Sequence, residues 1–142
     1  MKLKAFSNML QKLRSVEQKL TKEFESSTGF SLTRYEILIY LRDNGDSLQT
    51  KIAGYLEIDP AAVTRHLKIL EEKGHVERKR NKENGREVIV SLTDYARSEL
   101  VECEEKQSKN QCELPVPFKQ EEIEKLIDVL ENIEKKLELK NS

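Results

Sequence analysis

The sequence predicts a mainly α-helical fold with a small β-hairpin, an α+β arrangement in a single domain covering residues 1–142. Long stretches space their apolar residues by three or four positions, which is the period of an amphipathic helix. One short stretch instead alternates apolar and polar residues on both sides of Asn84-Gly85, which is typical of two strands joined by a turn. The 36% charged and 37% hydrophobic content favours long helices with a wide solvent-facing surface.

Residues 3–24 are predicted to form a long first helix, whose apolar face consists of Leu3, Phe6, Leu10, Leu13, Val16, Leu20 and Phe24. Gly29 is expected to end the loop that follows this helix. Thr33 stands three residues before Glu36, which is a capping-box pattern and predicts the start of a second helix. The segment Asn44-Gly45-Asp46 is expected to close the second helix.

A short third helix is expected from about Leu48 to Leu56, with Ser47 as its N-cap. Asp59-Pro60 then predicts the start of a fourth helix. The Asp side chain can accept from exposed N–H groups, and Pro lacks the N–H that would go unsatisfied at the first helical position. The fourth helix is expected to run to Lys73, and Gly74 is expected to supply the left-handed residue that ends it.

After the fourth helix the apolar period changes from 3.6 to 2. Residues 76–80 and 87–92 alternate as two strands, and Asn84-Gly85 between them is the strongest short-range signal for a type I′ turn. Thr93 is expected to cap a fifth helix that ends near Asn110, because Pro115 and Pro117 forbid its continuation.

A sixth helix, over residues 119–139, spaces its apolar residues by three, four, three and four positions. These residues are Ile123, Leu126, Leu130, Ile133 and Leu137. Such a heptad seam is a narrow apolar stripe suited to packing against a partner helix.

Charge is distributed unevenly, although the net charge is only -1. Residues 61–92 carry more basic than acidic side chains, whereas residues 93–142 are strongly acidic. The positive surplus coincides with the predicted hairpin and favours contact with nucleic acid there. The acidic C-terminal third is a poor nucleic-acid surface, so we expect it to serve another purpose.

Several classes of protein are disfavoured by what the sequence lacks. No segment approaches the roughly 18–20 apolar residues of a membrane span, and the N-terminus does not read as a signal peptide, so a cytoplasmic protein without a membrane partner is expected. No phosphate loop or nucleophile elbow occurs, so no catalytic residue and no cofactor is predicted. Cys103 and Cys112 lack CxxC spacing and are expected to be reduced thiols, and no metal site is predicted.

Three helices followed by a basic hairpin, over residues 31–92, are typical of a winged helix-turn-helix. In this arrangement the last helix enters the major groove of DNA and the hairpin, or wing, reaches neighbouring DNA. The link between the third and fourth helices, EIDP, is as short as the turn requires.

The fourth helix has two faces when its residues are placed at 100° steps. Val63, Leu67 and Leu70 face the core, whereas Ala61, Arg65 and Lys68 lie opposite, with Thr64 on the flank. Small residues near the start let a helix lie deep in the groove. Arg65 can then fork onto a guanine edge, and Lys68 suits a phosphate. The alternative is that Arg65 and Lys68 merely solvate an amphipathic helix.

The segment PAAVTRHLKILEEKG, which starts at Pro60, is followed by HVERKR and later by VSLTDYAR. Together these segments closely resemble the MarR family of bacterial winged-helix transcriptional regulators, and the resemblance covers essentially the whole chain in helix order. It implies a homodimer whose interface is built from residues 1–28 and 93–142. A pseudo-palindromic operator then follows, with half-sites about one helical turn apart. The resemblance also implies repression, and a small-molecule effector bound between the DNA-binding lobe and the dimerisation helices, although no residue indicates which effector.

The wing of this family usually carries an Asp-x-Arg motif, which aligns with Asn84-Gly85-Arg86. The resemblance implies that Arg86 enters the minor groove, while Asn84 cannot hold it with a charge-assisted pair. The predicted DNA-binding residues are Pro60, Ala61, Thr64, Arg65, Lys68, Arg78, Arg80, Lys82, Asn84 and Arg86. The predicted dimerisation residues are Leu3, Phe6, Leu10, Leu13, Ile123, Leu126, Leu130, Ile133 and Leu137.

The sequence therefore predicts a homodimeric repressor that binds duplex DNA and responds to a small molecule. Two alternatives stay open. One is a protein-interaction module whose basic hairpin meets an acidic surface. The other is a thiol- or metal-responsive regulator that uses Cys103 and Cys112.

Overall fold

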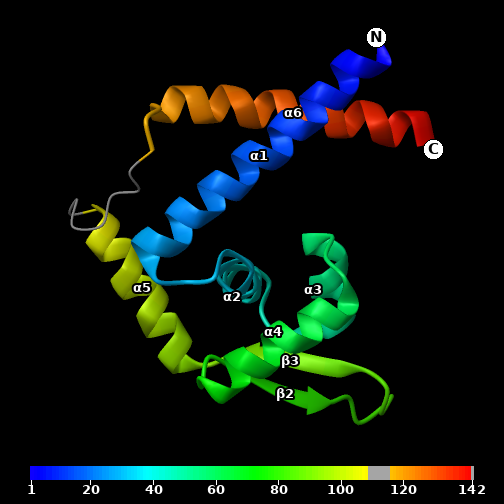
Figure 1. The fold of residues 1–142 in the computed structure, drawn as a ribbon. Coiled ribbons are helices and arrows are strands. Elements are labelled where there is room, and N and C mark those ends of the chain that lie inside the picture. The colour runs from blue at the N-terminus through cyan, green and yellow to red at the C-terminus, as the bar shows by residue number, and fades with distance from the viewer. Residues whose placement is uncertain (109–115, 142) are drawn as a thin grey trace.

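The computed structural model describes residues 1–108 and 116–141 and confirms a mainly α-helical fold with a small sheet (Figure 1). In chain order its elements are α1 (Leu3–Thr28), α2 (Leu32–Asn44), β1 (Ser47–Leu48), α3 (Gln49–Leu56), α4 (Pro60–Glu72), β2 (Val76–Arg80), β3 (Val88–Leu92), α5 (Asp94–Ser108) and α6 (Gln120–Asn141). Helices α2, α3 and α4 and the strands gather in one lobe, while α1 and α6 extend away from it (Figure 1).

The hydrophobic core lies in this lobe and continues onto α5. Its largest fully buried side chains are Ile37, Leu38, Leu41, Ile52, Val63, Leu67, Leu70, Val76, Val90 and Leu100. Neither α1 nor α6 holds a buried residue. The lobe therefore has its own core, whereas the two long helices leave much of their apolar faces exposed.

The sheet has three antiparallel strands in the order β1-β3-β2. The predicted hairpin is present as β2 and β3, but the third strand was not predicted, and the assignment of Ser47 as the cap of the third helix was wrong. Ser47 and Leu48 instead form β1, in which Ser47 pairs with Val90 and Leu48 with Ile89. Helix α3 therefore begins at Gln49, and no side chain caps its start.

The ends of α1 and α2 also differ from expectation. Helix α1 continues to Thr28, and Gly29 caps it directly with φ of 76°, a left-handed conformation that glycine adopts readily. The predicted capping box was wrong, because the N-cap of α2 is Ser31, two residues before Thr33. The hydroxyl of Ser31 accepts from the backbone N–H of Arg34 at 3.5 Å.

Helix α4 begins at Pro60 as predicted, but the side chain of Asp59 makes no capping hydrogen bond. Gly74 has φ of 79° just after the helix, which confirms its predicted left-handed role. Thr93 caps α5 as predicted, since its hydroxyl oxygen accepts from the N–H of Ala96 at 3.2 Å. The same hydroxyl lies 2.7 Å from the Gly74 carbonyl and donates to it, which fastens the start of α5 to the end of α4.

The expected end of the fifth helix near Asn110, together with Cys112 and Pro115, lies outside the described residues. Helix α6 starts within one residue of its predicted start and continues two residues further. No helix in the described ranges is long and apolar enough to cross a membrane.

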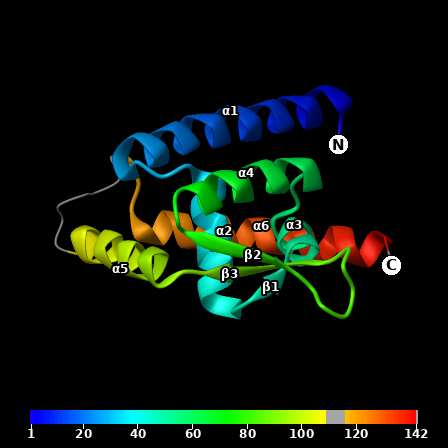
Figure 2. The ribbon, with the colours of Figure 1, turned by 90° about the horizontal axis from the view of Figure 1, so that it is seen from below.

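The wing tip is wider than predicted. Seven residues, 81–87, separate the end of β2 from the start of β3. A type I′ turn requires a positive φ at both central residues, and neither Asn84 nor Gly85 has one, so the prediction of that turn was wrong. Residues 81–87 instead form a loop that projects from the lobe (Figure 1, Figure 2). The loop is closed by the N–H of Asn81, which donates to the carbonyl of Glu87 at 2.8 Å.

Candidate nucleic-acid interface

Helix α4 presents one face to the core and the other to solvent, as its sequence pattern predicted. Val63, Leu67 and Leu70 are at most 2% exposed. Arg65 and Lys68 lie on the exposed side of the helix. The structure therefore leaves one guanidinium and one ammonium free to face a partner, next to the small residues at the start of the helix.

A hollow of about 440 Å³ separates the start of α4 from α3. Across it, the Nε2 of Gln49 donates to the hydroxyl of Thr64 at 2.7 Å, and that hydroxyl donates to the Pro60 carbonyl at 3.1 Å. Thr64 was predicted to contact DNA, yet both bonds engage its hydroxyl within the protein. It therefore offers mainly its methyl group and one lone pair outward. Gln49 was missed because nothing in the local sequence distinguishes it from a solvent-exposed helix residue.

The root of the wing is tied to α4 by Arg78. Its Nε and NH2 donate to the two carboxylate oxygens of Glu71 at 3.3 and 3.1 Å. This hydrogen bonding lowers the pKa of Glu71. Arg78 was predicted to contact DNA. Its guanidinium already makes two parallel hydrogen bonds to Glu71, and these bonds hold the start of the wing against α4.

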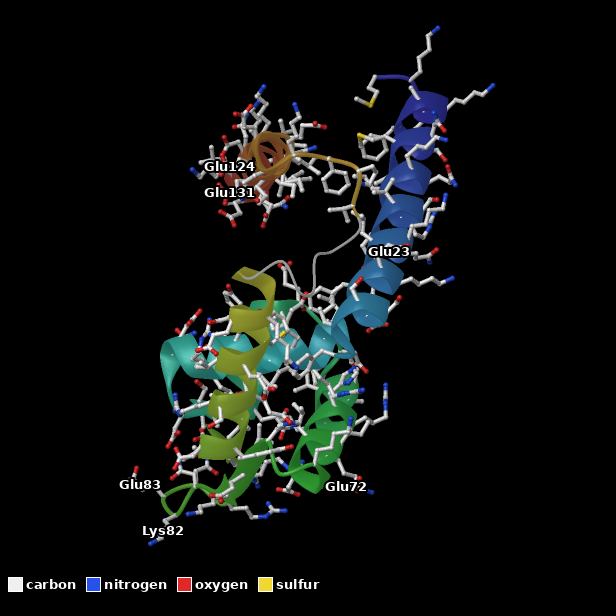
Figure 3. All side chains as sticks on the ribbon, turned by 90° about the vertical axis from the view of Figure 1, so that its left-hand side faces the viewer. Glu23, Glu72, Lys82, Glu83, Glu124 and Glu131 are labelled. Atoms are coloured by element: carbon white, nitrogen blue, oxygen red, sulfur yellow. The ribbon has the colours of Figure 1, made fainter. Side chains whose placement is uncertain are left out.

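The wing tip is shaped by two further side chains from the predicted DNA-binding set. The NH1 of Arg80 donates to the carbonyl of Gly85 at 2.8 Å, and Asn84 Oδ1 accepts from the backbone N–H of Arg86 at 3.1 Å. Asn84 thus holds the backbone of Arg86, not its guanidinium. Lys82 and Arg86 are exposed, and Lys82 lies at the far end of the hairpin (Figure 3).

The predicted dimerisation residues form two exposed apolar stripes, one on α1 and one on α6. Leu3, Phe6, Leu10, Leu13, Leu126, Leu130, Ile133 and Leu137 are 38% to 88% exposed, and Ile123 is half-buried. Charged side chains occupy other sides of α6. Glu124 and Glu131 lie on the side turned away from α1 (Figure 3). Each long helix is therefore amphipathic, and much of its apolar face stays exposed in this chain.

A second cavity, of about 360 Å³, lies where the α1–α2 junction, the end of α4 and the start of α5 meet. We call it the junction cavity. On its α5 side, Glu99 accepts from the hydroxyl of Tyr95 at 2.6 Å and pairs with Nε2 of His75 at 2.6 Å. These contacts lower the pKa of Glu99, the Tyr95 hydrogen bond having the larger effect.

On its other side the junction cavity reaches the middle of α4 through Arg34. The NH1 of Arg34 donates to Nδ1 of His66 at 3.4 Å. Burial lowers the pKa of His66, and the positive charges of Arg34 and Arg65 lower it further. These effects favour the neutral form of His66, which lies on the helix predicted to read DNA.

Cys103 is half-buried on α5 and lines a separate cavity of about 260 Å³ together with Phe30 and Lys106. Cys112, its suggested partner, lies outside the described residues. Within residues 1–108 and 116–141 no group of three His, Cys, Asp or Glu side chains is placed to hold a metal ion.

Comparison with known proteins places this chain among DNA-binding regulators. A model of the MarR family matches residues 30–88. The uncharacterized HTH-type transcriptional regulator YdgJ of Bacillus subtilis strain 168 is 36% identical over 124 residues, which are 87% of this chain and 76% of YdgJ.

Two solved structures share the fold of nearly the whole chain. Reduced AbfR bound to DNA has a TM-score of 0.82 at 21% identity, covering 99% of this chain and 96% of its own. A mutant MarR from E. coli complexed with operator DNA has a TM-score of 0.77 at 22% identity, covering 94% and 99%. The likeness therefore includes the long helices as well as the lobe.

Proposed function

The chain belongs to the MarR family of DNA-binding transcriptional regulators, and we propose that it is a homodimeric repressor of a pseudo-palindromic operator that responds to a small-molecule effector. Because its DNA target would lie in the bacterial cytoplasm, we propose that location as well. The relatives from Bacillus subtilis are consistent with a bacterial source.

The observation that carries the DNA-binding part is the outward face of α4 beside the wing. Arg65 and Lys68 are exposed on a helix whose opposite face is fully buried, so the helix is rigidly supported while its cations stay available. A guanidinium can read a guanine edge, and an ammonium suits a phosphate. At the wing, Lys82 and Arg86 extend the same positive surface.

Dimerisation is supported by the exposed apolar stripes of α1 and α6. Contiguous apolar surface of this kind is rare on a monomer in water and marks a site of association. The heptad spacing on α6 suits a partner helix. A two-fold dimer would present two copies of α4 and two wings, so it would bind two inverted half-sites about one helical turn apart. Bound over a promoter, such a dimer would block transcription.

Effector control is supported by the position of the junction cavity. The cavity contacts α4 and α5 at once, so a bound molecule could change how the DNA-binding lobe is held relative to the long helices. Its volume of about 360 Å³ falls within the range of small-ligand sites, about 300–1,000 Å³.

Selection from a random pool of duplex DNA tests the proposal. We expect enrichment of an inverted repeat whose affinity falls when 5 base pairs, about half a helical turn, are inserted between the half-sites. A pool without any enriched sequence would contradict the proposed function and favour the alternative of a protein-interaction module. Binding of a single chain to one half-site would contradict the dimer.

Thiol control is a second candidate, favoured by the half-buried Cys103 beside Phe30 and Lys106. Structures of AbfR bound to DNA exist for both the reduced and the overoxidized protein. If thiols control this chain, peroxide should weaken operator binding by the wild type but not by a variant with Ser at both Cys103 and Cys112. Equal responses of the two proteins would exclude this candidate.

A further inference from the structure

We propose that Asn84 at the wing tip is a site of spontaneous deamidation, and that the reaction lowers the positive charge of the wing. The second part rests on the proposed DNA-binding function, whereas the first concerns only the chemistry of the chain. Asparagine followed by glycine is prone to this reaction, because glycine has no side chain to keep its backbone nitrogen away from the asparagine amide. The chain contains two such pairs, Asn84-Gly85 and Asn44-Gly45, and their surroundings differ.

The reaction needs only water. The backbone nitrogen of Gly85 attacks Cγ of Asn84 and forms a new C–N bond, and the side-chain nitrogen leaves as ammonia with the proton that the backbone nitrogen gives up. The product is a cyclic imide. One water molecule then opens this ring at either carbonyl, which leaves aspartate or isoaspartate at position 84.

Both residues of the wing-tip pair are accessible, and the attacking nitrogen is free. Asn84 and Gly85 are exposed in the loop between β2 and β3. Among the described residues, no group accepts a hydrogen bond from the N–H of Gly85. A Cβ atom at Gly85 would meet no other atom within 4 Å, so there is room for the movement that the attack requires.

Two backbone N–H groups are placed to stabilise the charges that form during the attack. The N–H of Glu87 donates to the carbonyl oxygen of Asn84 at 3.0 Å. Peptide resonance puts negative charge on that oxygen when the nitrogen of Gly85 loses its proton. The N–H of Arg86 donates to Oδ1 of Asn84 at 3.1 Å, and Oδ1 becomes negative once Cγ is tetrahedral. Donors aimed at atoms where charge develops lower the barrier of a reaction.

Asn44-Gly45 has the same sequence but is protected by its hydrogen bonds. The N–H of Gly45 donates to the carbonyl of Leu41 at 2.8 Å, and Nδ2 of Asn44 donates to the carbonyl of Tyr40 at 2.9 Å. Both bonds belong to the end of α2, so an attack there must first break them and unwind the helix end. The two pairs therefore provide a comparison within one chain.

A carboxylate at position 84 changes how the wing meets DNA. The wing loses one net positive charge, whether that carboxylate faces DNA or pairs with the guanidinium of Arg86. Each wing then neutralises about one phosphate fewer, so the slope of log affinity against log salt falls by about 0.9 per wing. An aged protein molecule therefore binds its operator less tightly than a freshly made one.

Mass spectrometry of peptides from the incubated full chain tests the chemistry. At mildly alkaline pH, which favours loss of the peptide proton, we expect position 84 to convert at least about 10-fold faster than position 44. Gly85→Ala adds a methyl group where there is room, at a residue without a positive φ, so the loop should be kept. It should slow conversion at position 84 by about 10-fold and leave position 44 unchanged. Equal rates at the two positions in the wild type, or equal rates at position 84 in both proteins, would overturn the proposal.

Operator binding at several salt concentrations tests the consequence. We expect incubated wild type and fresh Asn84→Asp to show salt slopes lower by about 0.9 per wing than fresh wild type. Incubated Gly85→Ala should keep its initial slope. Complete conversion of the wild type with an unchanged slope would overturn the consequence for DNA binding. A fresh wild type that selects no DNA would contradict the proposed function instead, and the rates measured by mass spectrometry would still decide the chemistry.

Discussion

Leu130→Lys should separate the two chains of the proposed dimer. Leu130 lies in the middle of the α6 stripe and is 38% exposed. Fully burying a leucine contributes about 1.5–3 kcal/mol, so the exposed part still offers roughly 0.6–1.1 kcal/mol at an interface. A two-fold interface contains the residue twice, which gives roughly 1.2–2.3 kcal/mol and a dimer weakened about 7- to 45-fold by lost burial alone.

The lysine adds a second cost, because an ammonium that cannot reach water loses several kcal/mol of solvation. Asn132→Lys provides the matched control. It introduces the same charge on the same helix, two residues away and therefore about 200° around the helix from the apolar stripe. Sedimentation equilibrium over a range of concentrations should show Leu130→Lys as monomer where wild type and Asn132→Lys remain dimers. Because the operator requires two chains, Leu130→Lys should also bind it more weakly than wild type. Equal dimer affinity for Leu130→Lys and Asn132→Lys would refute the assignment of α6 to the interface.

Three further predictions concern the wing, the core and pH. Lys82→Ala should lower the slope of log affinity against log salt by about 0.9, if that exposed lysine neutralises one phosphate, and an unchanged slope in anisotropy titrations would exclude the contact. Leu67→Ala should lower the free energy of unfolding by about 2–5 kcal/mol, measured with urea at fixed protein concentration, because Leu67 is 0% exposed and a cavity remains. His66 has a pKa below its ordinary 6.5 in the folded chain, so the unfolded chain takes up its proton first as pH falls. Stability should therefore decrease as pH falls below about 6.5, and His66→Gln should flatten the thermal-denaturation profile in that window.

The helices were predictable because their signals are local. Apolar spacing placed α4 and α6 within two residues of their observed bounds, and Pro60 and Gly74 marked the start and end of α4 correctly. The buried face of α4 followed from the same spacing. In each case the residues that determine the structure lie within one or two helical turns of one another.

The features that were missed depend on contacts between distant segments. Strand β1 is only two residues long and exists because Ser47 and Leu48 pair with β3, more than forty residues away. The capping box at Thr33 failed because Ser31, two residues earlier, can also cap and does so in the structure. At the wing tip, Asn84-Gly85 favours a tight turn locally, but the bond from Arg80 to Gly85 holds a wider loop.

The candidate site shows the same division. Exposure of Arg65 and Lys68 followed from the helix period. The hydrogen bonds between Arg78 and Glu71 and between Thr64 and Gln49 could not be predicted in this way. Each of them joins two elements, and no local sequence pattern describes how those elements pack. With Arg80 and Asn84, which bond within the wing, four of the predicted DNA-binding side chains thus turn out to be hydrogen-bonded within the protein.

The measurement that tests the central claim most directly is the affinity of wild type and Arg65→Ala for every single-base variant of the selected operator. If Arg65 reads a base, the variant should bind the operator more weakly by about 1–3 kcal/mol and lose discrimination at one base pair, at symmetric positions in the two half-sites. A uniform loss of affinity, with the base preferences of the wild type unchanged at every position, would contradict the claim that α4 reads sequence through Arg65.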